Sequence, residues 1–117
     1  MSFPVEGRDN CVTVDGTPYV HVRTSAGSFV MAARCRHRGG PLNLAAHDPA
    51  GRRLVCPWHG GTRSVAALLR LVPAVRRGGT VTAVLPHDAT AERSYGHRPL
   101  SADLRVGCRE ATDPGGR

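Results

Sequence analysis

Two short stretches decide what this chain can be: RCRHRGGPL at positions 34–42 and CPWHGG at positions 56–61. Each stretch offers one cysteine and one histidine, and together they read C-x-H-x18-C-x-x-H. Two loops that each supply one thiolate and one neutral imidazole suit a [2Fe–2S] cluster in which one iron takes both cysteines and the other iron takes both histidines. The glycine pair that ends each motif permits tight turns and lets backbone N–H groups approach a cluster sulfur.

At these residues the chain resembles a Rieske [2Fe–2S] ferredoxin. The similarity covers about Val12 to Pro86, with support from YVHVRTSAGSFVMAARC before the first motif and LLRLVPAVRRGGTVTAVLP after the second. The resemblance implies one cluster per chain, with Cys35 and Cys56 on one iron and His37 and His59 on the other. It also implies an all-β fold, a small antiparallel assembly with the two cluster-binding loops at one tip.

The chain departs from the family pattern in two ways. Rieske proteins of the cytochrome bc type carry a further cysteine in each loop, joined as a disulfide, but this sequence has Gly40 and Trp58 at the equivalent places. Nothing after His59 resembles the serine and tyrosine that donate hydrogen bonds to high-potential clusters, which favours the low-potential, oxygenase-associated branch. The segment between Gly61 and Leu68 is also short, which predicts a cluster that is either unusually exposed or partly covered by a partner or by the C-terminal tail.

Two other interpretations of the motifs remain open. Two cysteines and two histidines also satisfy tetrahedral zinc, although zinc fingers usually present a cysteine pair and then a histidine pair, whereas each loop here is mixed. A metal-stabilised interaction or regulatory module, without an electron-transfer role, is the alternative from another functional class.

Length and composition limit the architecture. The chain has 117 residues, which allows one domain, and its 4% aromatic content predicts a thin core that would benefit from a metal site. No apolar run is long enough to span a membrane and the first residues lack a secretory profile, so we expect a cytoplasmic protein with reduced cysteines. The formal net charge is +7, and it falls on the first 86 residues.

The hydrophobic pattern predicts short strands followed by a tail. Segments 11–14 and 19–23 flank an Asp-Gly turn and read as a hairpin that places Val20 and Val22 on one face. Further strands are expected at 29–33 and 80–85, whereas 64–71 fits either a helical turn or a buried strand. We therefore expect a Rieske domain over residues 1–86 and a polar, loosely ordered extension over residues 87–117.

Other chemically interesting side chains have simpler interpretations. His21 falls on the polar face of a predicted strand, and the remaining histidines outside the motifs lie in apparent loops, so all of them are expected to be solvated. Cys11 and Cys108 lack a partner motif and are expected to be free thiols. Trp58 is expected to pack beside the cluster rather than relay electrons.

Together these features predict a one-electron carrier that passes electrons from a reductase to an oxygenase-type partner, docking through a basic face. The expected carrier is a non-catalytic component that binds no nucleic acid, membrane or organic substrate. The enzyme-class alternative, an oxygenase fragment, is not expected, because the 31 residues after Pro86 cannot build the catalytic domain with a two-histidine, one-carboxylate iron site that a Rieske oxygenase also needs. The sequence does not identify the reductase or the oxygenase-type partner.

Overall fold

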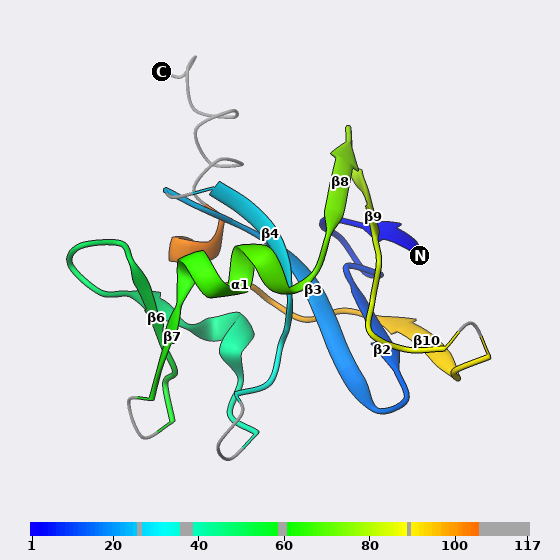
Figure 1. Cartoon of the computed structure of the whole chain (residues 1–117), viewed down its shortest axis with the longest axis horizontal. Helices are drawn as coiled ribbons and strands as arrows, with labels where there is room; N and C mark the ends of the chain where they lie inside the picture. The colour runs from blue at the N-terminus through cyan, green and yellow to red at the C-terminus, as the bar shows by residue number, and fades with distance from the viewer. Residues whose placement is uncertain (26, 36–38, 59–60, 89, 106–117) are drawn as a thin grey trace.

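The described part of the chain forms three small antiparallel sheets, one short α-helix and two 3-10 helices (Figure 1). The structure, a computed structural model, describes residues 1–25, 27–35, 39–58, 61–88 and 90–105. Because antiparallel strands dominate these residues, the predicted all-β class is confirmed.

The central sheet has the strand order β10-β2-β3-β4. Its members are β2 (Cys11–Val14), β3 (Thr17–Thr24), β4 (Gly27–Ala32) and β10 (Arg93–Gly96). Asp15 and Gly16 both take positive φ angles, 50° and 84°, as a two-residue turn between twisted strands requires. The predicted hairpin is therefore present, with Val14 opposite Thr17.

Two three-stranded sheets accompany the central one. The first has the order β1-β9-β8 and consists of β1 (Ser2–Pro4), β8 (Ala74–Arg77) and β9 (Thr80–Ala83). The other has the order β5-β6-β7 and consists of β5 (Ala46–His47), β6 (Arg53–Val55) and β7 (Thr62–Ser64). A short 3-10 helix, η1 (Leu42–Leu44), leads from the first motif into β5.

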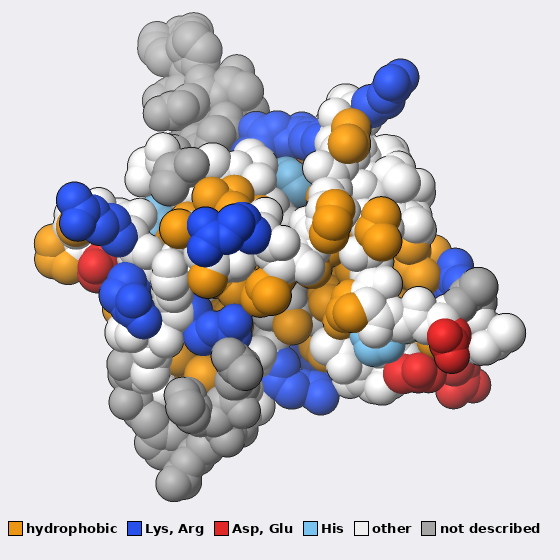
Figure 2. Space-filling model, in the orientation of Figure 1, with side chains coloured by type: hydrophobic (Ala, Val, Ile, Leu, Met, Phe, Trp, Pro, Cys, Tyr) orange, Lys and Arg blue, Asp and Glu red, His pale blue; other side chains and the backbone are white. Residues whose placement is uncertain are grey.

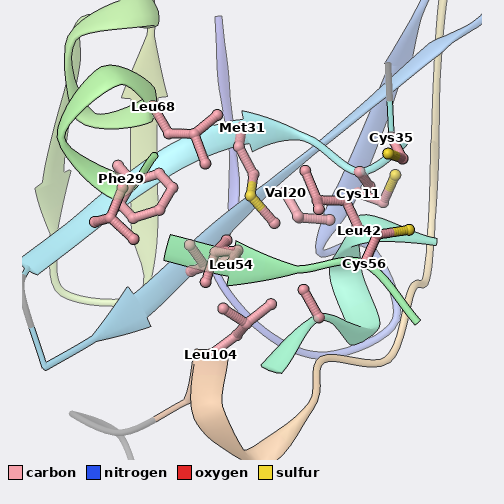
Figure 3. Packing of buried hydrophobic residues seen from close by; sticks show 14 residues of the cluster. Cys11, Val20, Phe29, Met31, Cys35, Leu42, Leu54, Cys56, Leu68 and Leu104 are labelled. Carbon is pink, nitrogen blue, oxygen red and sulfur yellow. The ribbon is translucent and has the colours of Figure 1, made fainter. Parts of the chain in front are cut away.

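The core divides into two clusters because side chains alternate along the central strands. Val20 and Val22 belong to the first cluster, as predicted, together with Phe29 and Met31 of the neighbouring strand β4. This cluster also receives Leu54 from β6, and it ends at the cysteines (Figure 3). The second cluster joins residues of the central sheet to Phe3 and Val81 of the β1-β9-β8 sheet.

The ambiguous segment after the second motif forms a helix, α1 (Val65–Leu71). The side chain of Ser64 caps it by accepting a hydrogen bond from the backbone N–H of Ala67 at 3.3 Å. Val65 and Leu68 are buried in the first core cluster, whereas Leu71 is exposed. Pro73 ends the helix, since it disfavours helical backbone in the residue before it. No helix in the described part of the chain is long and apolar enough to cross a membrane.

Residues 93–105 differ from the loosely ordered extension that the sequence predicts. Strand β10 pairs with β2, and the buried Asn10 side chain exchanges two hydrogen bonds with the backbone of Arg98. The second 3-10 helix, η2 (Ala102–Leu104), inserts Leu104 into the first core cluster. All four residues of β10 are exposed, so the segment carries no alternating pattern that sequence analysis could detect. Residues 106–117 lie outside the described residues.

His21 is buried, which contradicts the expectation that it is solvated. Only 4% of the residue is exposed. Burial, assisted by the nearby Arg23 charge, lowers the pKa of His21 to about 4. The imidazole is therefore neutral at pH 7.

This depressed pKa predicts an acid-sensitive contribution to stability. An unfolded histidine gains its proton near pH 6.5, whereas folded His21 stays neutral down to about pH 4. Between these pH values protonation stabilises only the unfolded chain, so the stability present above pH 6.5 is lost as the pH falls. The loss at pH 5 should be about 1–2 kcal/mol, reduced by solvent in the open pocket beside the ring.

The thermal midpoints of the wild-type protein and His21→Gln at pH 7 and pH 5 check this prediction. The wild-type midpoint should fall by several degrees more than that of the variant. His97→Gln, at an exposed histidine, should behave like the wild type. Equal acid sensitivity in the wild-type protein and His21→Gln would contradict the assignment.

Candidate metal centre

The first motif forms a loop that closes on its own backbone. The N–H of Cys35 donates to the carbonyl oxygen of Gly40 at 2.8 Å, and the N–H of Gly39 donates back to the carbonyl oxygen of Cys35 at 3.0 Å. Gly39 takes a φ of 69°, which glycine adopts without steric cost. Arg34 and Pro41 pair as an isolated bridge at the base of the loop.

The second motif is closed in the same way. It joins β6 to β7, and the N–H of Cys56 donates to the carbonyl oxygen of Gly61 at 2.7 Å. In both loops the cysteine thus pairs with the glycine five positions later. The repeated closure places each cysteine at the start of its loop.

The two cysteines meet between the loops. Cys35 is 7% exposed and Cys56 is 1% exposed, both belong to the first core cluster, and Cys35 lies close enough to raise the pKa of the Cys56 thiol. In Figure 3 both side chains lie at the same end of the first core cluster, together with Cys11. Two loops separated in sequence by a whole hairpin therefore bring their sulfurs to one place, as the spacing predicts.

Gly40 and Trp58 face each other across the two loops. A Cβ atom built on Gly40 would lie 3.0 Å from the Cβ of Trp58 and 2.8 Å from the Sγ of Cys56. The two positions that hold a disulfide in the cytochrome bc type are thus adjacent here, but the missing side chain leaves room for Trp58 and for the sulfur. Trp58 itself is 51% exposed, so it covers the site from one side and contacts solvent on the other.

The environment of Cys56 favours the protonated thiol in the metal-free chain. Burial is the largest cause that raises its pKa, and the neighbouring Cys35 raises it further. The backbone N–H of Trp58 acts in the opposite direction, because it donates a hydrogen bond to the Cys56 sulfur. This N–H would equally stabilise a metal-bound thiolate, whose formation releases the proton.

The donor chemistry of this place fits an iron–sulfur cluster. Two buried cysteines, each at the start of a loop that closes on a glycine, would provide one half of the predicted two-cysteine, two-histidine ligand set. His37 and His59, predicted as the other half, lie outside the described residues, as do Arg36, Arg38 and Gly60.

The remaining cysteines and histidines have varied locations. Cys11 is a free, buried thiol in the same core cluster as Cys35 and Cys56, a proximity that no local motif signals. Cys108 lies outside the described residues. His97 is exposed, and its Nδ1 donates to the carbonyl oxygen of Gly7 at 2.8 Å. The action of the Trp58 N–H on the Cys56 sulfur could not be predicted from the sequence, because every non-proline residue carries a backbone N–H.

Comparison with known proteins agrees with the geometry of the two loops. The family model described as the Rieske [2Fe-2S] domain matches residues 2–88, which include both motifs and all strands from β1 to β9. No curated protein and no solved structure matches this chain. A domain of this kind binds a Rieske-type [2Fe–2S] cluster and supports electron transfer. The chain therefore belongs to the Rieske [2Fe–2S] domain family.

Proposed function

We propose that this protein is a ferredoxin-type one-electron carrier, which takes an electron from a reductase and passes it to an oxygenase-type partner. The meeting of the two loops, where Gly40 of the first loop lies against the buried Cys56 sulfur of the second, carries this proposal. The bound cluster supplies the redox chemistry. The chain supplies the ligands, the shielding from solvent and the surface that a partner recognises.

In this proposal Cys35 and Cys56 hold the inner iron, and His37 and His59 hold the outer iron. The inner assignment rests on burial, because the two cysteines end the first core cluster. The outer assignment rests on sequence, since each histidine follows its cysteine by two or three positions within a loop.

Charge on the surface around these loops suits an acidic partner. Between residues 34 and 77 the sequence has nine arginines and a single acid, Asp48. Figure 2 shows Arg side chains spread over the side that carries α1 and the β6–β7 hairpin, whereas most of the visible Asp and Glu gather near β10. Arg34, directly before Cys35, is exposed, as is half of Trp58. A cationic surface with an exposed aromatic ring is well suited to a transient interface.

These arginines should also raise the reduction potential. Reduction adds one negative charge, and one Arg about 8 Å away at an effective dielectric near 20 stabilises it by roughly 2 kcal/mol, or about 90 mV, before screening. Solvent exposure should reduce this to about 20–40 mV per residue. Arg36→Gln and Arg38→Gln should therefore lower the potential and make the rate of reduction by a reductase less sensitive to salt.

Arg77→Gln is the matched control for these variants. Arg77 lies on β8, which Figure 1 places far from the β6–β7 loop, so its replacement should leave the potential unchanged. If neither loop variant lowers the potential and the rate is indifferent to salt, the arginines reflect composition alone.

Electron counting tests the proposed function directly. Anaerobic protein should accept one electron per two irons from dithionite and release it on reoxidation, over repeated cycles. It should also be reduced by NADH through a flavoprotein reductase and then reoxidised by an oxygenase component. A chain that holds zinc, or that never cycles, would support the alternative of a metal-stabilised interaction or regulatory module.

A further inference from the structure

A pocket of about 380 Å³ lies on the domain, and none of its lining residues belongs to the two cysteine loops. It forms because β2 pairs only with residues 17–20 of β3, whereas β4 continues along β3 to Thr24. The edge of β3 at His21 and Arg23 is therefore not covered by β2. Residues of the segments 5–10 and 97–105 wall the resulting space, whose volume lies in the range of small-molecule sites.

The walls of this pocket are strongly cationic. The guanidinium-bearing residues Arg23, Arg98 and Arg105 line it, against the single carboxylate of Glu6. The backbones of Arg23 and Arg105 pair directly as an isolated parallel bridge, which brings two positive residues together. Within the described residues, none of the three arginine side chains has an ion-pair partner. Like charges held together without a counter-charge favour the binding of an anion.

A buried polar side chain at the same place provides a second, independent observation. His21 is 4% exposed and lines the pocket, yet among the described residues its ring nitrogens have no hydrogen-bond partner. These nitrogens are not among the fully enclosed unpartnered atoms, so they are accessible from the pocket and can bond to a ligand atom there. Because the ring is neutral at pH 7, it can donate one N–H and accept one hydrogen bond.

The lining also includes apolar residues. Pro99 and Leu100 contribute accessible apolar surface, whereas Val5 and Leu104 are buried. The Asn10 side chain fixes the wall by its two hydrogen bonds to the Arg98 backbone, so the shape of the pocket does not depend on the arginine side chains. An inorganic anion would leave this aliphatic surface unused, whereas an organic anion would bury its apolar body there.

From these observations we infer that the pocket is a binding site for a small organic anion, with a carboxylate or phosphate head group among Arg23, Arg98, Arg105 and His21 and an apolar body against Pro99 and Leu100. The electron-carrier role needs no such ligand, so this site is a separate property of the chain. A ligand held there would cross-link the N-terminal segment, β3 and the segment 97–105.

Titration calorimetry of the cluster-loaded protein at low salt tests the site with three probes: benzoate, phenyl phosphate and the neutral isostere benzamide. Benzoate or phenyl phosphate should bind, and whichever binds more tightly identifies the head group. Benzamide should bind at least about tenfold more weakly, because it keeps the ring and loses the charge. Arg23→Gln and the exposed Arg105→Gln should each weaken anion binding about tenfold, whereas Arg70→Gln on α1 should not.

The visible spectrum of each variant shows that the domain remains folded, and it separates failure of this site from failure of the electron-carrier proposal. The inference is overturned if neither anion binds, if benzamide binds as well as benzoate, or if both pocket variants bind like Arg70→Gln.

Discussion

Replacing either loop histidine, in His37→Ala or His59→Ala, is expected to abolish the Rieske-type visible and paramagnetic resonance spectra. Removal of one imidazole leaves the outer iron with an incomplete ligand set, which a small side chain cannot restore. Cys35→Ser and Cys56→Ser should prevent assembly altogether, because each removes a thiolate ligand of the proposed inner iron from a buried position. Spectra and iron content of the purified variants are the measurements.

Matched controls exist for both ligand types. His97→Ala removes an exposed imidazole that bonds only to the backbone of Gly7, and it should keep the full spectrum. Cys11→Ser is the stricter control, since Cys11 is buried in the same core cluster as the proposed ligands. A normal spectrum from His59→Ala, or loss of the cluster in Cys11→Ser, would contradict the ligand assignment.

A single added methyl group, in Gly40→Ala, is expected to remove most of the bound iron. The new Cβ would lie 2.8 Å from the Cys56 sulfur and 3.0 Å from the Cβ of Trp58, closer than carbon atoms approach either group. Relieving this overlap requires the two loops to separate, at a cost of about 1–3 kcal/mol, and moves a proposed ligand sulfur. Iron and sulfide content per chain measure the effect.

Gly79→Ala serves as the control, because a Cβ on Gly79 would meet nothing within 4 Å and its φ is not positive. It should assemble the cluster normally. A Gly40→Ala protein with full cluster content would show that the loops do not meet as tightly as the structure describes.

Local signals explain what the sequence predicts correctly. The Asp15-Gly16 turn depends on two adjacent residues, and the strand around Val20 and Val22 depends on simple alternation, so both follow from short-range rules. The two cysteine loops are likewise recognisable from the spacing of their cysteines and histidines. Segment 65–71 was ambiguous because its apolar run fits helix or strand, and the Ser64 cap together with Pro73 resolves it in favour of a helix.

Features that depend on distant contacts could not be predicted. Strand β10 is exposed throughout and is held by pairing with β2 some 80 residues earlier in the chain. The alternating pattern of its own strand places His21 on a solvated face. The residues from 97–105 that line a pocket together with His21 are distant in sequence, so the strand itself gives no sign of them. The approach of Gly40 to Trp58 depends on the packing of two loops, which spacing alone does not define.

Cluster content tests the central claim most directly. Protein purified without oxygen should be red-brown, contain about two irons and two acid-labile sulfides per chain, and give a Rieske-type paramagnetic resonance signal on reduction. These three results together would distinguish a mixed cysteine–histidine cluster from zinc and from a four-cysteine cluster. One zinc ion per chain without sulfide would contradict the account.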